Sequence, residues 1–171
     1  AAITLSGNIA AADSGDVDIN NDVTLDGAAL VSSDNGDVNF DGTITGAFPL
    51  SVNAESGDVI FNDNVGGDGT VPADRLAELT VSADELILQN NADNIATHAT
   101  DVDDALVDGD VDLTGVPLVT ILTNATIDTE GGDGIAAGDI LFAQFGRVNA
   151  DDNTVALDAG PASTATTACA V

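Results

Sequence analysis

The chain repeats one short phrase five times: glycine, aspartate, an aliphatic residue, any residue, and then a large apolar residue. The copies are GDVDI, GDVNF, GDVIF, GDVDL and GDILF, which begin at Gly15, Gly36, Gly57, Gly109 and Gly138. The first three copies begin 21 residues apart. A fixed period of roughly 20 to 50 residues is typical of proteins whose units stack on one another, because one unit cannot bury its own apolar face. The phrase therefore predicts a stack of similar units.

Alternation of apolar and polar residues indicates that these units are built from strands. After Gly15, the apolar residues Val17, Ile19, Val23 and Leu25 alternate with aspartate and threonine. A period of two places such residues on one face of a strand. Glycine, asparagine and aspartate occupy the junctions between the runs, where tight turns need them. We therefore predict an all-β chain, a parallel β-solenoid with coils of about 21 residues.

Some segments depart from this pattern. A helical turn is expected near residues 73–79, before strand character returns. Residues 90–110 have the weakest periodicity, and we predict an irregular excursion there, either a loop or two short elements. The tail after Gly160 is small and polar. The predicted organisation is one solenoid domain over residues 1–160, with its excursion near 90–110, and a low-complexity tail or tether over residues 161–171.

The charge balance excludes whole classes of partner. Two Lys and Arg residues against 30 Asp and Glu residues give a net charge of −28. Binding to phosphates requires Lys and Arg, so we expect neither nucleic acid nor an anionic membrane surface as a partner. Apolar runs stay shorter than the ~18 to 20 residues of a membrane span, so no membrane insertion is expected either.

The sequence offers no constellation that favours catalysis. His98 is the only histidine and Cys169 the only cysteine, and they are too remote in sequence to suggest a nucleophile and its base. Carboxylate pairs arise by chance among 30 acids, so their presence carries no weight. We expect a protein that is not an enzyme and that requires no cofactor. Cys169 is interpreted as an incidental thiol or, alternatively, as the half of an intermolecular disulfide.

Two acid-containing motifs resemble calcium loops but lack an essential ligand. Residues 66–69 and 131–134 begin like the calcium-binding nonapeptide without its later acid, and we interpret both as turns. The triplet Asp108, Asp110 and Asp112 has EF-hand spacing, but Leu113 replaces the glycine that the loop needs.

One candidate metal site depends on stacking. If units of 21 residues stack, Asp16, Asp37 and Asp58 form an outward ladder. At a spacing of ~4.8 Å, two such charges repel by ~0.9 kcal/mol in water. Either salt screens this repulsion and the ladder is simply solvated, or a divalent cation, calcium by preference, binds along it.

Longer stretches of the sequence resemble a known group of proteins. The residues GDVNFDGTITGAFPLSVNAESGDVIFNDNVGG from Gly36, followed by LAELTVSADEL from Leu76, resemble the β-strand-repeat proteins related to filamentous haemagglutinin and the passenger domains of autotransporter adhesins. The residues GDGIAAGDILFAQFGRVNADDNTVALDAG from Gly132 resemble the opening of a second such unit. The resemblance implies a right-handed parallel β-helix, secretion and a role as a surface adhesin or fibre. It brings no catalytic residues.

We therefore predict a non-enzymatic, secreted structural or adhesive protein at the cell surface, a unit of a filament or giant adhesin. Its expected partners are copies of itself, joined head to tail through exposed strand edges, and glycans of a host or matrix surface. An alternative function is a carbohydrate-binding or carbohydrate-cleaving β-helix. An alternative fold is a β-sandwich filament subunit, in which a segment such as residues 1–5 completes the sheet of a neighbour.

The repeated phrase also predicts the direction in which particular side chains point. The third and fifth positions of the phrase should face inward and form ladders from coil to coil. The residues concerned are Val17, Val38, Val59 and Ile140, with Ile19, Phe40, Phe61 and Phe142.

Overall fold

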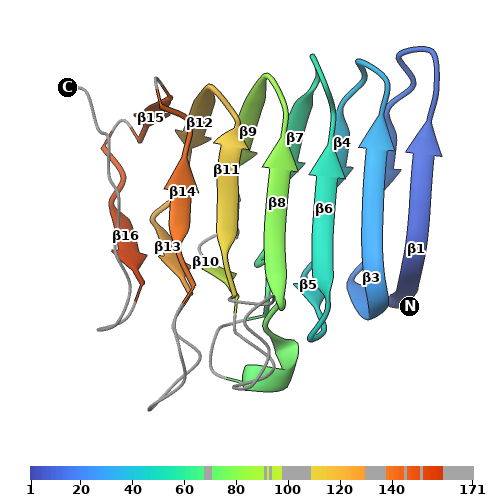
Figure 1. Cartoon of the computed structure of the whole chain (residues 1–171), viewed down its shortest axis with the longest axis horizontal. Helices are drawn as coiled ribbons and strands as arrows, with labels where there is room; N and C mark the ends of the chain where they lie inside the picture. Colours follow the sequence, from blue (N-terminus) through green and yellow to red (C-terminus); the bar gives the residue numbers. More distant parts are fainter. Residues whose placement is uncertain are drawn as a thin grey trace.

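The computed structural model describes residues 1–67, 71–90, 92, 94–97, 109–129, 138–144, 146–150 and 152–159. In this part of the chain all regular elements are strands, apart from one turn of 3-10 helix at Pro72–Asp74 (η1). The strands lie side by side along the long axis of the molecule, with β1 at one end and β16 at the other (Figure 1).

The strands form three sheets, and every pairing between described strands is parallel. The first contains β1 (Ile3–Ala11), β3 (Val23–Ser33), β6 (Pro49–Asn53), β8 (Glu78–Ser82), β11 (Val111–Gly115) and β14 (Ile140–Phe142), with β5 (Ile44–Thr45) paired to β3. The second contains β2 (Val17–Ile19), β4 (Val38–Phe40), β7 (Asp58–Phe61), β9 (Glu85–Leu88), β12 (Leu118–Ile121) and β15 (Arg147–Asn149). The third contains β10 (Asn94–Ala96), β13 (Ala125–Asp128) and β16 (Val155–Asp158).

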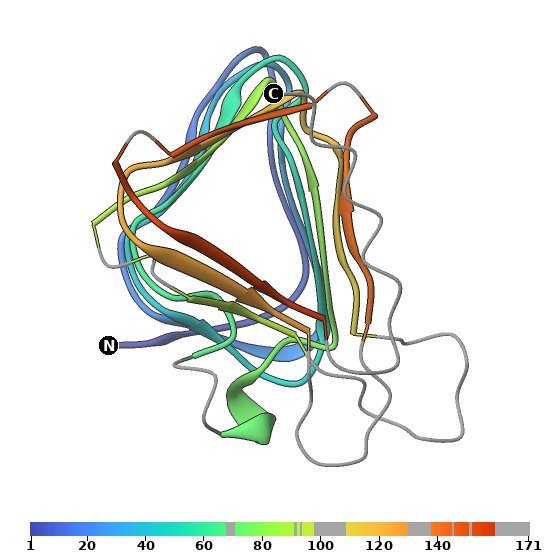
Figure 2. The same ribbon diagram turned by 90° about the vertical axis from the view of Figure 1, so that its left-hand side faces the viewer.

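Seen along its axis, the molecule is a three-sided coil (Figure 2). Face 1 consists of the C-terminal halves of β1 and β3 with β6, β8, β11 and β14, and face 2 is the second sheet. Face 3 consists of the third sheet, the N-terminal halves of β1 and β3, β5 and the bridge residue Val65. The chain visits face 3, face 1 and face 2 in turn, counterclockwise as it approaches the viewer in Figure 2. The predicted right-handed parallel β-helix is confirmed, and the β-sandwich alternative is wrong because the sheets enclose one common interior.

Apolar ladders from all three faces fill the interior. Face 2 stacks Val17, Val38, Val59, Leu86, Val119 and Val148, and beside them Ile19, Phe40, Phe61, Leu88 and Ile121. Face 3 stacks Ile3, Val23, Ile44, Val65, Ile95, Ile127 and Leu157. Face 1 stacks Gly7, Ala29, Leu50, Leu79, Val111 and Ile140. Stacking of this kind buries in each coil what a single coil would expose.

The predicted inward residues are buried, with one correction to their grouping. Val38, Val59 and Phe61 are fully buried, whereas Phe142 is partly buried. Ile140 is also buried, but it pairs with Val111 in face 1 and does not join the ladder of Val17. The prediction of a common ladder is wrong for Ile140 and Phe142 because the fourth and fifth copies of the phrase open face 1, whereas the first three open face 2.

Coil length is not constant. Along face 3 the steps from Val23 to Ile44 and from Ile44 to Val65 are 21 residues, as predicted, but the next step, to Ile95, is 30. Most of the additional residues enter at the corner between face 3 and face 1. That corner spans six residues from Ile44 to Leu50 but 14 from Val65 to Leu79. The ladders of the three faces therefore continue while mainly this corner grows.

One of the predicted irregular segments falls at this enlarged corner, and part of the other continues face 3. The helical turn expected over 73–79 is the single turn η1, and β8 already begins at Glu78. Part of the predicted excursion near 90–110 is the strand β10, which continues face 3. Residues 98–108, with His98, and the tail 161–171, with Cys169, lie outside the described residues.

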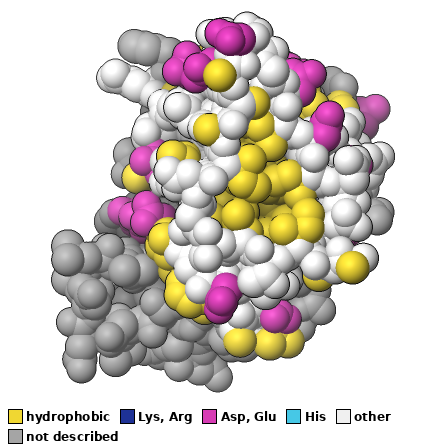
Figure 3. Space-filling model, turned by 90° about the vertical axis from the view of Figure 1, so that its right-hand side faces the viewer, with side chains coloured by type: hydrophobic (Ala, Val, Ile, Leu, Met, Phe, Trp, Pro, Cys, Tyr) yellow, Lys and Arg dark blue, Asp and Glu magenta, His cyan; other side chains and the backbone are white. Residues whose placement is uncertain are grey.

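The apolar interior reaches the end of the rod. Figure 3 looks at the end formed by the first coil, where apolar side chains occupy the middle of the surface and carboxylates lie around its rim. Leu5 and Ile19 line the interior there, with Ile3 and Ile9 partly buried against them. Within the described part of the chain, the first coil thus has a neighbouring coil on one side only.

Candidate functional site: the aspartate corner and the open ends

The aspartates of the first three phrases form the predicted ladder at the corner that leads into face 2. The backbone N–H of Asp37 donates a hydrogen bond to Oδ1 of Asp16 at 3.0 Å, and the N–H of Asp58 donates to Oδ1 of Asp37 at 2.9 Å. Each of these carboxylates therefore satisfies a backbone donor of the following coil, which strand pairing alone leaves open at a corner. The ladder exists, and its first role is structural.

The fourth and fifth phrases repeat the same bond on another face. The N–H of Asp139 donates to Oδ1 of Asp110 at 2.7 Å, although these residues are 29 positions apart and lead into face 1. The aspartate of the phrase is thus a corner residue that binds the next coil, whichever face follows.

The glycine of the phrase is required by the close approach of successive coils. A Cβ added at Gly36 would lie 2.6 Å from the carbonyl oxygen of Gly15, and one added at Gly57 would lie 2.2 Å from that of Gly36. Real Cβ atoms do not approach a carbonyl oxygen so closely. Only a hydrogen fits between the coils here, which explains why glycine precedes aspartate in each of these copies.

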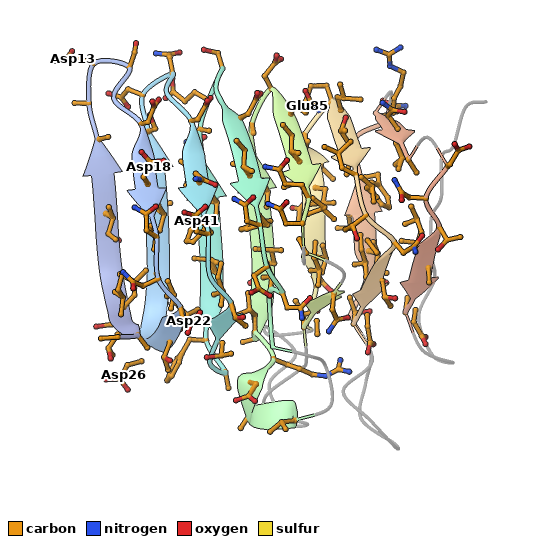
Figure 4. The ribbon with its side chains drawn as sticks, turned by 180° about the vertical axis from the view of Figure 1, so that it is seen from behind. Asp13, Asp18, Asp22, Asp26, Asp41 and Glu85 are labelled. Carbon is orange, nitrogen blue, oxygen red and sulfur yellow. The ribbon has the colours of Figure 1, made fainter. Side chains whose placement is uncertain are left out.

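Negative charge accumulates along this corner. The pKa of Asp58 is raised above its ordinary value of 3.8, first by burial and then by the charges of Asp37, Glu85 and Asp84, while a hydrogen bond from the backbone of Glu85 opposes the change. Glu85 is also the cross-strand partner of Asp58, so the acidic row passes from Asp16 to Glu85 over four coils. The other labelled acids are spread over the outer surface and do not converge on one point (Figure 4).

The structure gives the predicted calcium site no coordination shell. Among the described residues, no group of three or more His, Cys, Asp or Glu side chains is arranged to hold a metal ion. Oxygens of Asp16 and Asp37 already accept backbone hydrogen bonds, with which a cation would compete. A calcium ion along Asp16, Asp37 and Asp58 remains a prediction.

The two rejected calcium motifs have structural roles where they are described. Gly66 and Gly67 have positive φ angles of 83° and 66°, as the predicted turn requires. Asp112 accepts hydrogen bonds from the backbone and hydroxyl of Thr114. Asp108 and residues 131–134 lie outside the described residues.

A buried arginine holds the enlarged corner together, and the sequence did not reveal it. Arg75 donates to the carbonyl oxygen of Thr97 at 3.0 Å and forms an ion pair with Asp128 at 2.5 Å. Its side chain is 8% exposed. The three residues belong to three successive coils, so Arg75 joins them where their extra residues leave the solenoid.

Two buried threonines close the bases of these insertions in the same way. The hydroxyl of Thr97 donates to the carbonyl oxygen of Gly109, and the hydroxyl of Thr129 donates to that of Gly138 at 2.7 Å. Both side chains are fully buried. Each bond connects the end of a face-3 strand to the Gly-Asp phrase that opens face 1.

Among the described residues, the last coil, like the first, has no neighbouring strand on its outer side. Val148 and Leu157 are 40% and 41% exposed, although they continue ladders whose preceding members, Val119 and Ile127, are buried. A hollow of about 270 Å³ lies at Val148, lined by Leu118, Arg147, Val148 and Asn149. β14, β15 and β16 are the last strands of their sheets, as β1 and β2 are the first.

No described helix is long and apolar enough to cross a membrane. No family model, no curated protein and no solved structure matches the chain.

Proposed function

We propose that the protein is a non-enzymatic structural unit of an extracellular filament or large surface adhesin, which lengthens by head-to-tail stacking of copies. The observation that carries this proposal is that no described residue covers either end of the solenoid. Its apolar ladders run into the first and the last coil, and the terminal strands of each sheet have one free edge among the described residues.

A free edge of this kind favours association. The outer edge of a terminal strand presents backbone N–H and C=O groups to which another strand can bind. Solenoids normally cover such ends with a capping element. Among the described residues the only helical turn is η1, which lies at the enlarged corner and across neither end.

The apolar residues at the ends add to this tendency. Burial of one large aliphatic side chain stabilises an interface by about 1.5 to 3 kcal/mol. Val148 and Leu157, which are 40% and 41% exposed, would each gain the part of this stabilisation that corresponds to their remaining exposed surface if another coil covered them. Association then extends the existing ladders and needs no new kind of contact.

The extracellular and adhesive part of the proposal rests on other support. The resemblance to β-strand-repeat adhesins favours a secreted surface protein, and the net charge of −28 suits a saline exterior, where salt screens repulsion between copies. Contacts with surface glycans would then come from the outer faces or from the enlarged corner, since the ends are engaged by other copies.

The test is the state of association of the purified protein. We expect sedimentation to show concentration-dependent oligomers at moderate salt, and negative-stain images to show rods one solenoid wide. Val148→Asp should make the protein monomeric. Val71→Asp is the matched control, because Val71 is also exposed, at 46%, but lies at the enlarged corner. A wild-type protein that is strictly monomeric at high concentration and at every salt concentration would contradict the proposal.

A further inference from the structure

We propose that copies join in a single register, in which Arg147 of one copy lies opposite Asp16 of the next, and in which β16 replaces residues 3–5 of that next copy. This inference rests on the proposed head-to-tail assembly and specifies its contact residues.

The register follows from the row of outward side chains along one edge of face 2. Cross-strand pairing connects Asp58 to Glu85, Glu85 to Leu118 and Leu118 to Arg147. Asp37 and Asp16 precede Asp58 in the same row. The row therefore begins with an aspartate at one end of the rod and finishes with an arginine at the other.

Charge makes this arrangement specific. Arg147 is one of two Lys and Arg residues in the chain, it is exposed, and it forms no ion pair with any described residue. A head-to-tail contact places its guanidinium beside the Asp16 carboxylate of the next copy. A contact between two first coils would instead place Asp16 near another Asp16. The pair thus favours one polarity of assembly.

Neighbouring rows are compatible with the same register. In face 2, Val148 would meet Val17 inside, and the Asn149 amide would meet the Asp18 carboxylate outside. In face 1, Ile140 would meet Gly7, where an added Cβ has nothing within 4 Å. In this register, Val148 and Ile140 therefore contact apolar side chains or open space in the next copy, and the Asn149 amide can donate a hydrogen bond to the Asp18 carboxylate.

Face 3 holds one strand position more than the other two faces. The first and the last described strand segments both lie on this face, so its described ladder has seven members, from Ile3 to Leu157, whereas the ladders through Gly7 and Val17 have six each. If faces 1 and 2 continue without a gap, β16 and residues 3–5 of the next copy require the same place beside Val23 of that copy. One of the two segments must leave it.

The contacts indicate that residues 3–5 leave and β16 stays. β16 pairs with β13 over four residues, and Thr154 just before it binds Oδ1 of Asn124 through its N–H and its hydroxyl, at 2.9 and 3.0 Å. Residues 3–5 pair with β3 over three residues, and their pairing is separated from the rest of β1 by a register shift before Gly7, whose φ is 96°. The first segment can therefore detach at Gly7 while the rest of β1 stays paired.

Charge exchange tests the Arg147–Asp16 contact. We expect Arg147→Asp and Asp16→Arg each to weaken association about three- to tenfold, and the double exchange to restore it. If net charge alone governed association, Asp16→Arg would strengthen it, because this change makes the protein less negative. Asp16→Asn keeps an acceptor for the Asp37 N–H and serves as the folding control.

Cysteine cross-linking tests the register. In a Cys169→Ser background, Asp18→Cys combined with Asn149→Cys should give a ladder of disulfide-linked multimers on oxidation, since neighbouring strands ~4.8 Å apart suit a disulfide. Asn20→Cys combined with Asn149→Cys is offset by two residues, ~6.6 Å along the strand, and should not cross-link.

Two substitutions in face 3 test the strand replacement. Leu157→Asp should abolish association, because Leu157 would lie against Val23 of the next copy. Ile3→Asp should leave association unchanged or strengthen it, because it loosens the segment that has to leave.

The outcomes of these experiments distinguish a failure of the proposed register from a failure of the proposed function. Three outcomes would overturn the proposed register while head-to-tail assembly itself stands. These are association that Leu157→Asp leaves unaffected, association that Ile3→Asp abolishes, and association that the double charge exchange does not restore. Absence of any association in the wild-type protein would overturn the proposed function.

Discussion

The rings of Phe40 and Phe61 lie in successive coils of face 2 with their centroids 5.4 Å apart and their planes inclined by 37°. Both residues occupy the fifth position of the repeated phrase, and both are fully buried. Tilted aromatic pairs at this distance add to the stability that burial alone provides. This part of the interior is therefore filled by side chains that the repeat itself specifies.

Replacement of one of these rings should unfold the protein. Phe40→Asp removes a contact for Phe61 and places a charge in the core, so we expect a loss of at least about 3 to 5 kcal/mol in unfolding free energy. Asn39→Asp is the control: its Oδ1 accepts from Asn62, as a carboxylate also can, and the bond that it loses, from Nδ2 to Oδ1 of Asp41, is exposed, so we expect a loss of less than about 1 kcal/mol. Urea unfolding followed by circular dichroism measures both. If both substitutions were tolerated equally, this would contradict the observation that Phe40 points inward and Asn39 outward.

A methyl group at the tightest corner should also be destabilising. Gly57→Ala would force its Cβ against the carbonyl oxygen of Gly36, and overpacking of this kind costs about 1 to 3 kcal/mol or more. Gly15→Ala is matched to it, because Gly15 belongs to the same phrase but has no coil before it, and its nearest contact would be 3.3 Å. We expect the control to change stability by less than about 1 kcal/mol. Similar melting temperatures for the two variants would show that the coils are not stacked so closely.

The two arginines should differ sharply in their effect on folding. Arg75→Ala leaves Asp128 without its ion pair in a partly buried place and should cost about 3 kcal/mol or more. Arg147→Ala removes the same charge from an exposed position and should change the unfolding free energy of the monomer by no more than about 0.5 kcal/mol. Melting curves at low protein concentration, where association is absent, provide the comparison. An Arg75 variant as stable as the Arg147 variant would contradict the role of Arg75 at the corner.

The raised pKa of Asp58 predicts a specific dependence on pH. The native state holds this proton to a higher pH than the unfolded chain, whose value is near 3.8. The contribution of Asp58 to stability therefore decreases as pH rises from that value through the native pKa, and the ionised group destabilises the fold at neutral pH.

Asp58→Asn should remove this destabilisation while keeping an acceptor for the backbone of Glu85. We expect the variant to melt at a higher temperature than the wild type at pH 7, with the difference shrinking as pH falls toward 3.8. Asp18→Asn controls for the loss of one charge, because Asp18 is the exposed middle residue of β2, the first strand of face 2. A difference that stays constant from pH 3 to pH 7 would contradict the assignment.

Salt should stabilise the fold because the net charge is −28 and acids line one corner at the spacing of the coils. Screening reduces repulsion in the compact state, and a cation that binds only the native state stabilises it further. Melting curves in chelator, sodium chloride and calcium chloride at equal ionic strength separate the two effects. Identical curves in the two salts would eliminate a calcium site and leave screening, and curves that are flat in all three would contradict both.

The sequence predicted correctly which side chains of the first strands point inward, but it did not predict the contacts between residues of distant coils. Alternation predicted that Val38 and Phe40 point inward, because one buried face fixes the register of a strand. It could not assign Ile140 to face 1, since the Gly-Asp phrase serves any corner at which an aspartate binds the next coil. The aspartate ladder was predicted, but the use of its oxygens as backbone acceptors depends on side-chain direction at the corner.

The contacts of Arg75 illustrate the limit most clearly. Its partners Thr97 and Asp128 lie 22 and 53 residues further along the chain. These separations depend on how many residues each coil inserts at its corner, and no local pattern carries that information. The only sequence feature that could have drawn attention to Arg75 is the scarcity of basic residues, since the chain contains two Lys and Arg residues in all.

The hydroxyl bonds from Thr97 to Gly109 and from Thr129 to Gly138 mean that the chain leaves the solenoid and returns to it at adjacent points. The segment between such points can differ in length and composition without any change in the three faces. Evolution can therefore change the sequence between these points while the rod stays the same. An engineer could use the same two positions to graft foreign peptides onto the solenoid.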